Sequence, residues 1–323
     1  MNFLVKLAIF VGFYAVFHAF ILRRFIAGCV CRSRATLEGK TVIITGSNTG
    51  IGKETALDLA QRNARVIMAC RDLTKAEAAL KEIVEKTGNK NIVAKHLNLA
   101  SLKSVREFAE DINSNEPRLD VLMNNAGVMF VQTLSKTEDG FEMQMGVNHL
   151  GHFLLTNLLL DLLKRSAPSR IINVSSMFHR FVGASGFDFD NMNGEVSYSP
   201  YGAYGQSKLA NILFTRELAR RLNNTQVTAN SLHPGAVATE LTRYLPNWMQ
   251  MFLNPIYGYF TKNPREGAQT SIHLAVSEEL DDVTGQYFAD CDQRMPAEAA
   301  QDDQAAGKLW DVSAKLVGLD TSD

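Results

Sequence analysis

Short apolar runs alternate with longer amphipathic segments through the chain after residue 40. Thr41–Thr45 (TVIIT) and Arg65–Cys70 (RVIMAC) are rich in β-branched and apolar residues, which is typical of strands buried on both faces. Similar runs predict strands at 91–99, 119–123 and 170–174. Helical periodicity between the runs predicts helices over 50–62, 72–87, 102–113 and 151–164. This alternation predicts right-handed βαβ units.

The fold class follows from those units. We expect an α/β fold, a Rossmann-type doubly wound parallel sheet with helices on both faces. No repeat, low-complexity tract or linker interrupts residues 40–320. A single domain over 38–323 is therefore expected, preceded by a separate segment over 1–37.

That first segment begins with a long apolar run. Phe3–Leu22 contains only Lys6 and His18 besides apolar residues and glycine, and twenty helical residues span about 30 Å, the thickness of a bilayer core. The basic residues follow the run, and no small-residue cleavage site is present, so a retained membrane-anchor helix is favoured over a cleaved signal peptide. A buried first helix of the domain is the alternative.

Charge is distributed unevenly. The chain has a net charge of −1, but residues 1–40 carry six basic residues against one acidic residue. The acidic remainder excludes a nucleic-acid partner. Basic residues after the apolar run predict a cytoplasmic domain if the membrane is the endoplasmic reticulum.

The four cysteines are Cys29, Cys31, Cys70 and Cys291. They are too few and too scattered for a disulfide framework, and none forms a CxxC pair, so a reducing compartment is expected. Cys29 and Cys31 lie beside the predicted membrane helix, where palmitoylation and free thiols are both compatible with the sequence.

A glycine-rich turn joins the first predicted strand to the first predicted helix. Its spacing, G-x3-G-x-G, permits a tight turn, close approach of the backbone to a pyrophosphate and close helix packing, while the helix N-terminus offers N–H groups. Predicted cofactor contacts from this turn are Gly46, Ser47, Asn48, Thr49, Gly50, Ile51 and Gly52.

The end of the second strand indicates which cofactor binds. An acidic residue there usually meets a free ribose 2′-hydroxyl, but this chain has Cys70 followed by Arg71. A guanidinium can bind a 2′-phosphate with two hydrogen bonds, so NADP(H) is favoured. Asp72 is acidic but is also suited to cap the next helix. A solvated surface charge is the alternative for Arg71.

Tyr204 and Lys208 are four residues apart, which places a phenol and an ammonium on one face of a helix. A phenol with a pKa near 10 is a poor base at neutral pH. The ammonium, together with the positive ring of an oxidised nicotinamide, favours the phenolate and lowers that pKa.

Several motifs occur in a fixed order, and they include TGSNTGIGKETA, VIMACRD, NNAGVM, SAPSRIINVSS, Tyr204-x3-Lys208, SKLANILFTREL and Pro234-Gly235. Over about residues 38–320 this set of motifs resembles the short-chain dehydrogenase/reductase superfamily. The particular residues within the motifs resemble those of the retinol dehydrogenase branch. The resemblance implies an NADP-dependent alcohol dehydrogenase or carbonyl reductase. It also points to mitochondria, so the expected location is the endoplasmic reticulum or the mitochondrial inner membrane.

The resemblance also implies residue roles. Tyr204 would be the general acid/base and Lys208 its pKa partner and ribose ligand, while Ser176 would orient the carbonyl oxygen and Asn148 would hold a water linking Lys208 to solvent. Further cofactor contacts implied are Asn125, Ala126 and Gly127 on the adenosine ribose side, and Pro234, Gly235 and Thr239 on the nicotinamide side. Asn98 replaces the family's aspartate and keeps an acceptor oxygen for adenine, so modestly weaker cofactor binding is expected. The histidines that lie among apolar residues are expected to pack in the protein interior and not to bind a metal, and no metal site is expected.

Two aromatic-rich segments flank the predicted site. One lies between Ser176 and Tyr204 and contains Phe178, Phe181, Phe187, Phe189, Tyr198 and Tyr201. The other is 241–260, which suits a long apolar substrate, an amphipathic segment lying on the membrane, or both.

The function expected is therefore a membrane-anchored NADP(H)-dependent oxidoreductase that interconverts retinol-like alcohols and retinal-like aldehydes, acting as a retinal reductase. The expected partners are a hydrophobic, retinoid-like small molecule and membrane lipid, with no oligomeric state predicted. The alternatives are a carbonyl reductase of steroids or lipid aldehydes and a non-catalytic NADP(H)-binding scaffold.

Overall fold

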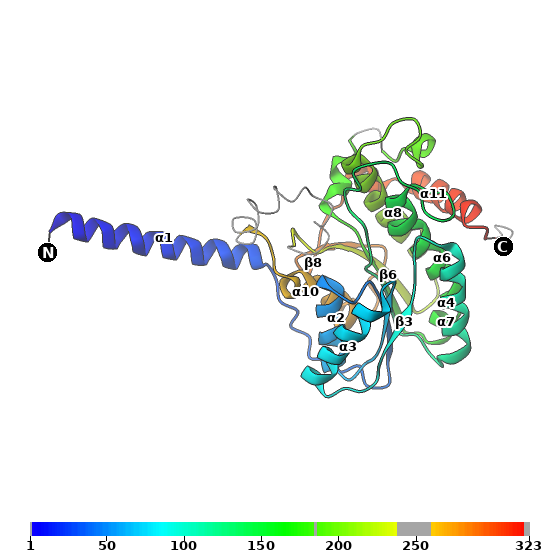
Figure 1. Ribbon diagram of the computed structural model, residues 1–323, viewed down its shortest axis with the longest axis horizontal. Helices are drawn as coiled ribbons and strands as arrows, with labels where there is room; N and C mark the ends of the chain where they lie inside the picture. Colours follow the sequence, from blue (N-terminus) through cyan, green and yellow to red (C-terminus); the bar gives the residue numbers. More distant parts are fainter. Residues whose placement is uncertain (1, 184–185, 238–259, 320–323) are drawn as a thin grey trace.

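The computed structural model describes residues 2–183, 186–237 and 260–319. The described residues are built around an eight-stranded sheet, which Figure 1 shows between its covering helices. The strand order is β3-β2-β1-β4-β5-β6-β7-β8, with β1 to β7 parallel and β8 antiparallel to β7. The strands are β1 (Thr41–Thr45), β2 (Arg65–Cys70), β3 (Ile92–His96), β4 (Val121–Asn124), β5 (Ser169–Val174), β6 (Val227–His233), β7 (Tyr287–Ala289) and β8 (Asp292–Gln293). The predicted doubly wound fold is confirmed.

Helices cover both faces of the sheet and bury two separate apolar clusters. Ile43 of β1 packs into one cluster and its neighbours Val42 and Ile44 into the other, because successive side chains of a strand point to opposite faces. One face carries α2 (Gly50–Gln61), α3 (Leu73–Thr87) and α10 (Pro264–Val276); the other carries α4 (Leu102–Asn115), α6 (Gly151–Leu158), α7 (Leu160–Arg165), α8 (Pro200–Arg221) and α11 (Asp303–Leu316).

The helix expected over 151–164 is longer and less regular than predicted. It is preceded by a short α5 (Met143–Met145) and one π-helical turn, η1 (Gly146–Leu150), and it is interrupted at Leu159 between α6 and α7. The π turn contains Asn148, whose side chain bonds to the backbone of Val128. A turn of this kind often marks a functional site, and here it faces the carboxyl ends of the strands.

The helix α1 (Phe3–Ala27) extends away from the sheet and its side chains are mostly exposed (Figure 1). It continues five residues beyond the predicted apolar run, through Arg23 and Arg24. By length and composition it is able to cross a membrane. Its apolar window is not buried against the part of the chain that the structure describes, which contradicts the alternative of a buried first helix.

One expectation about the cysteines is wrong. Cys29, just after α1, forms a disulfide with Cys291 in the turn between β7 and β8, with Cα atoms 6.0 Å apart. The two cysteines are 262 residues apart, and they meet because the segment after α1 folds back onto that turn. The disulfide leaves Cys29 without the free thiol that palmitoylation needs, and the expected reducing compartment stays a prediction. Cys31 and Cys70 are free.

Candidate active site

The carboxyl ends of the parallel strands surround a cavity of about 580 Å³. Its walls come from the glycine turn after β1, the segments after β2, β4, β5 and β6, and the face of α8 that carries Tyr204 and Lys208. In doubly wound sheets this crevice is where ligands bind. The cavity therefore lies where the predicted cofactor and catalytic residues were expected to meet.

The glycine turn has the conformation that its spacing predicts. Gly46 and Gly50 have left-handed φ angles of 65° and 57°, and a Cβ at Gly52 would lie 2.6 Å from the Gly46 carbonyl oxygen. Asn48, Thr49 and Ile51 line the cavity together with these three glycines. Ser47 does not line it, because its buried hydroxyl donates to the Ile44 carbonyl.

Arg71 lies exposed at the rim of the cavity and makes no hydrogen bond or ion pair with any residue that the structure describes. Asp72 accepts a hydrogen bond from the Lys75 N–H and so caps α3, as the sequence suggested. The carboxylate of Asp72 is therefore occupied, and the guanidinium of Arg71 stays available to an anion in the cavity.

Asn98 lines the cavity, but its side chain is already engaged. Its Oδ1 accepts from the Ala100 N–H and its Nδ2 donates to Glu138 Oε1. The oxygen expected to face adenine thus shares its lone pairs with the backbone. The weaker cofactor binding expected from Asn98 stays a prediction.

The segment after β4 is held by Thr45. The Thr45 hydroxyl accepts from the N–H groups of Asn125 and Ala126, and Asn125 Nδ2 donates to the Thr45 carbonyl. Gly127 follows, where a Cβ would lie 3.1 Å from Asn148 Oδ1 and 3.5 Å from Lys208 Nζ. The predicted cofactor residues 125–127 therefore border the predicted catalytic ones.

Tyr204 and Lys208 are both buried on α8, and the Lys208 ammonium is 5.7 Å from the centre of the Tyr204 ring. Lys208 Nζ also donates to the carbonyl of Val174, the last residue of β5. Ser176 lies two residues beyond, within hydrogen-bond reach of the tyrosine. Its neighbour Ser175 donates to the Lys208 carbonyl and joins β5 to α8.

Burial dominates the electrostatics of this pair. Burial raises the pKa of Tyr204 to about 12, with the hydrogen bond to Ser176 acting in the opposite direction. Burial also lowers the pKa of Lys208 to about 8. The pKa of the tyrosine therefore moves opposite to the predicted direction in the protein alone, and a lowering by an oxidised nicotinamide stays a prediction.

Asn148 joins three parts of the site. Its Nδ2 donates to the Val128 carbonyl and to Ser207 Oγ, and its Oδ1 accepts from the Val128 N–H. Its own carbonyl accepts from His152 Nδ1. Both Nδ2 hydrogens and one lone pair of Oδ1 are thus used in positioning, and the water expected at Asn148 stays a prediction.

An aromatic wall closes the cavity beside Tyr204, and its central residue was not predicted. Phe130 has a left-handed φ of 56° and donates its N–H to Gln144 Oε1. Its ring lies 5.3 Å from Tyr204, 5.0 Å from Phe178 and 4.6 Å from Tyr201. The only sequence signal for Phe130 is its position three residues after Gly127.

The other predicted aromatic residues separate into different surroundings. Phe187 and Phe189 pack edge to face, with ring centres 4.8 Å apart, and both contribute to the core. The Tyr198 hydroxyl donates to the Val131 carbonyl. The Phe181 side chain is exposed. Thr239 and residues 241–259 lie outside the described residues.

The loop after β6 completes the cavity. Pro234 and Gly235 line it, and Gly235 has a left-handed φ of 93°. His233, also in the lining, accepts a hydrogen bond at Nδ1 from the Met177 N–H. Within residues 2–183, 186–237 and 260–319, no cluster of three or more His, Cys, Asp or Glu is placed to hold a metal ion.

The chain is similar to proteins of a known family. The family model "short chain dehydrogenase" matches residues 40–187 and 190–250. Retinol dehydrogenase 13 of Homo sapiens, which the motif wording resembles, is 54% identical over 307 residues, covering 94% of this chain and 92% of the relative. Human retinol dehydrogenase 12 is 48% identical over 318 residues, covering 98% and 99%.

Solved structures agree. An uncharacterised protein from Mycobacterium paratuberculosis superposes with a TM-score of 0.72 and 34% identity, covering 91% of this chain and 98% of that one. A complex of Pseudomonas aeruginosa RhlG with NADP superposes with a TM-score of 0.62 and 26% identity, covering 78% and 95%. The chain belongs to the short-chain dehydrogenase family and is an oxidoreductase of its retinol dehydrogenase branch.

Proposed function

We propose that this protein is a membrane-anchored, NADP(H)-dependent reductase that converts retinal-like aldehydes to retinol-like alcohols. The observation that carries the proposal is the buried set of Ser176, Tyr204 and Lys208 facing a cavity with an aromatic wall. The similarity to retinol dehydrogenases supports the substrate class.

The chain's own residues would act on the carbonyl oxygen. When bound, the nicotinamide supplies the hydride. The Ser176 hydroxyl orients the oxygen and Tyr204 gives it a proton, while Lys208 binds the cofactor ribose and stabilises the phenolate left on the tyrosine. Asn148 keeps Gly127 and Lys208 in place through its contacts with Val128 and Ser207.

The pKa of Tyr204 favours reduction. With a pKa of about 12 in the protein alone, the phenol keeps its proton at neutral pH and is ready to donate it. Alcohol oxidation needs the phenolate, which burial disfavours. Reduction begins with the reduced cofactor, whose nicotinamide ring is uncharged, so no positive ring opposes the effect of burial.

The choice of NADP(H) as the cofactor rests on Arg71. The other proposed cofactor contacts are the glycine turn 46–52, Asn98, residues 125–127, Pro234, Gly235 and Thr239. An exposed guanidinium at the cavity rim with no partner among the described residues is suited to a 2′-phosphate. We therefore propose NADP(H) as the cofactor, with 38–323 as the single catalytic domain and 1–37 as the anchor.

A panel assay tests the substrate and the direction. The purified full-length protein is given retinal, a steroid ketone and an alkenal with NADPH or NADH, and retinol with NADP⁺, between pH 6 and 9. We expect retinal with NADPH to give the highest kcat/KM. We also expect the ratio of reduction to oxidation to fall as pH rises, because higher pH favours the phenolate. Higher kcat/KM for the steroid or alkenal would select the alternative substrate class, and no turnover of any substrate would favour the scaffold.

Replacement of Tyr204 tests the acid. Tyr204→Phe removes the only proton that the ring can transfer but keeps the aromatic packing with Phe130 and Phe178, so kcat should fall about 10²- to 10⁴-fold. NADPH binding, followed by fluorescence, should persist. More than about a tenth of wild-type kcat would assign the proton to another group.

Replacement of Arg71 tests the cofactor. Arg71→Ala removes a charge-assisted contact, so the Kd of NADPH should rise about 10- to 100-fold while the Kd of NADH stays nearly constant. Titration of both cofactors by fluorescence measures this. Lys75→Ala, at the same cavity lining, is a matched control for general loss of positive charge. Equal losses for both cofactors would show that Arg71 does not bind the 2′-phosphate.

We further propose that α1 spans the membrane and that the catalytic domain faces an oxidising compartment. The basic flank predicts the cytoplasmic side, but Arg23 forms an ion pair with Glu266, so this charge also has a role within the folded protein. The Cys29–Cys291 disulfide favours the lumen of the endoplasmic reticulum or the mitochondrial intermembrane space.

Extraction and thiol labelling test both statements. The protein should stay in the membrane at alkaline pH, because carbonate breaks electrostatic contacts but does not extract a spanning helix. After denaturation, alkylation should label two thiols without reductant and four with it, measured by intact mass. Four labelled thiols without reductant would place the domain on a reducing side, and release by carbonate would indicate a peripheral helix.

A further inference from the structure

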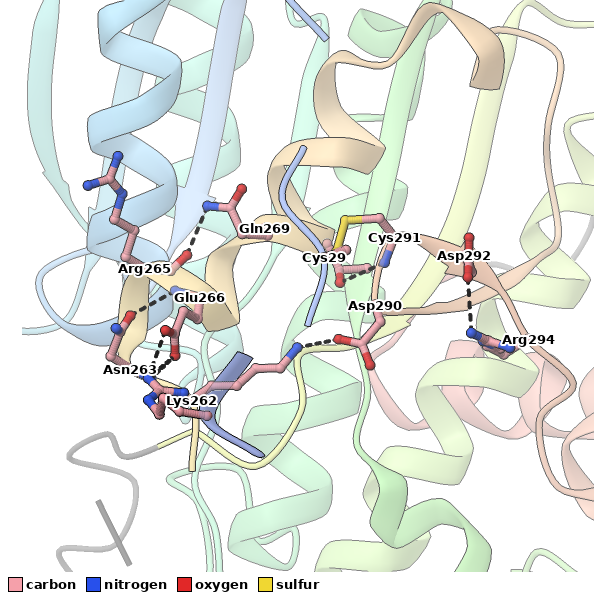
Figure 2. Close-up of polar contacts among 12 residues, drawn as sticks. Cys29, Lys262, Asn263, Arg265, Glu266, Gln269, Asp290, Cys291, Asp292 and Arg294 are labelled. Atoms are coloured by element: carbon pink, nitrogen blue, oxygen red, sulfur yellow. Dashed lines mark hydrogen bonds and ion pairs between the residues drawn. A yellow bond between two sulfur atoms is a disulfide. The ribbon is translucent and has the colours of Figure 1, made fainter. Parts of the chain in front are cut away.

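Residues 23–31, which comprise the last turn of α1 and the first residues after it, are attached to the domain at several points. We call this segment the anchor flank. Arg23 Nη2 lies 2.7 and 2.6 Å from the two carboxylate oxygens of Glu266, the Cys31 N–H donates to Gln269 Oε1 at 3.0 Å, and Cys29 is bonded to Cys291. These contacts attach the anchor flank to the first turns of α10 and to the β7–β8 turn. Figure 2 shows the disulfide between Cys29 and Cys291 beside Glu266 and Gln269 of α10.

Lys262 lies at the centre of this attachment. Its side chain is buried, and its ammonium pairs with Asp290, the neighbour of the disulfide-bonded Cys291 (Figure 2). Asp290 itself is half exposed. A buried ammonium depends on such a partner, because its loss of hydration is otherwise uncompensated. Asp290 therefore fixes where the end of the Lys262 side chain lies.

Two glycines enclose the Lys262 side chain from opposite segments. On one side is Gly28 of the anchor flank, with a φ of 70°, where a Cβ would overlap Asp290 Oδ1 and lie 2.7 Å from Lys262 Nζ. On the other side is Gly235, where a Cβ would lie 2.9 Å from both Cδ and Cε of Lys262. Neither approach leaves room for a methyl group.

The backbone of Lys262 is joined to the same loop as its side chain. The Lys262 N–H donates to the Ala236 carbonyl at 2.8 Å, and Lys262 forms a parallel bridge with Val237. The pKa of His233 is lowered to about 4, mainly by burial and then by His179. The Lys262 charge lowers this pKa further, whereas Asp290 raises it. The loop 233–237 thus touches Lys262 along most of its length.

We propose that Lys262 is a positioning residue through which the anchor flank sets the place of the Pro234–Gly235 backbone in the active site. The Lys262 ammonium pairs with Asp290 next to Gly28, and the methylene groups of the same side chain contact Gly235. The side chain therefore sets the distance between the anchor flank and Gly235. The anchor flank is then a structural part of the active site as well as the connection to the membrane. This inference rests on the proposed assignment of Pro234 and Gly235 to the nicotinamide side of the cofactor.

Full-length Gly28→Ala tests the proposal, because the added methyl group must displace Asp290 or Lys262. Gly39→Ala is the matched control: Gly39 has a φ of 71°, but its Cβ would have nothing within 4 Å. We expect kcat to fall about tenfold in Gly28→Ala relative to Gly39→Ala, since a displacement of about 1 Å at reacting groups costs up to about 10²-fold.

Binding separates a displaced loop from a general defect. The Kd of NADPH, measured by fluorescence, should rise several-fold in Gly28→Ala, whereas the Kd of 2′,5′-ADP, which lacks the nicotinamide half, should equal that of wild type. The same kcat and NADPH Kd in both alanine variants would overturn the proposal. An equal rise in both dissociation constants would also overturn it.

Two variants of Lys262 test the contact between its side chain and Gly235 directly, and they can be used if Gly28→Ala does not fold. Lys262→Met keeps an apolar stem against Gly235, and Lys262→Ala removes the stem as well. The proposal requires Lys262→Ala to weaken NADPH binding several-fold more than Lys262→Met, with 2′,5′-ADP binding unchanged in both. Equal NADPH affinity in the two variants would overturn it. Neither readout needs turnover of retinal, so failure of the proposed substrate leaves this test intact.

Discussion

The buried amide of Asn148 is the contact on which the rest of the site depends. It bonds to both backbone groups of Val128 and to Ser207, so it connects the segment after β4, the π turn and α8. A buried amide left without these partners would cost about 1–3 kcal/mol for each unpaired group. Gly127 and Lys208 are close to each other because Asn148 holds the segments that carry them.

A chain of hydrogen bonds extends this constraint to the glycine turn. The Thr45 hydroxyl accepts from two N–H groups after β4 and lies 2.8 Å from His152 Nε2. The Asn148 carbonyl can only accept, so His152 donates to it from Nδ1, and Nε2 of the neutral ring accepts the Thr45 proton. Burial lowers the pKa of His152 to about 4, so the ring stays neutral and the tautomer is fixed at physiological pH.

Much of this arrangement could be predicted from the sequence because it depends on local spacing. The strand–glycine–helix order determines where Gly46 and Gly50 lie, and a four-residue separation brings Tyr204 and Lys208 to one helix face. Phe130 could not be predicted, since its place in the wall depends on a left-handed φ supported by Gln144. The Cys29–Cys291 pair and the role of Lys262 arise from segments more than 200 residues apart that meet only in the folded chain.

The loop after β6 borders both the cavity and the anchor flank, and two ion pairs fix the anchor flank beside it. Arg23, the first basic residue after the apolar run, is paired with Glu266, which also caps the start of α10 through Asn263. Lys262, just before that helix, is paired with Asp290. Both cations are thus neutralised by the domain itself, so the end of α1 is held at a fixed place relative to the loop after β6. If α1 spans a membrane, as proposed above, this attachment also fixes how the cavity is oriented relative to the bilayer.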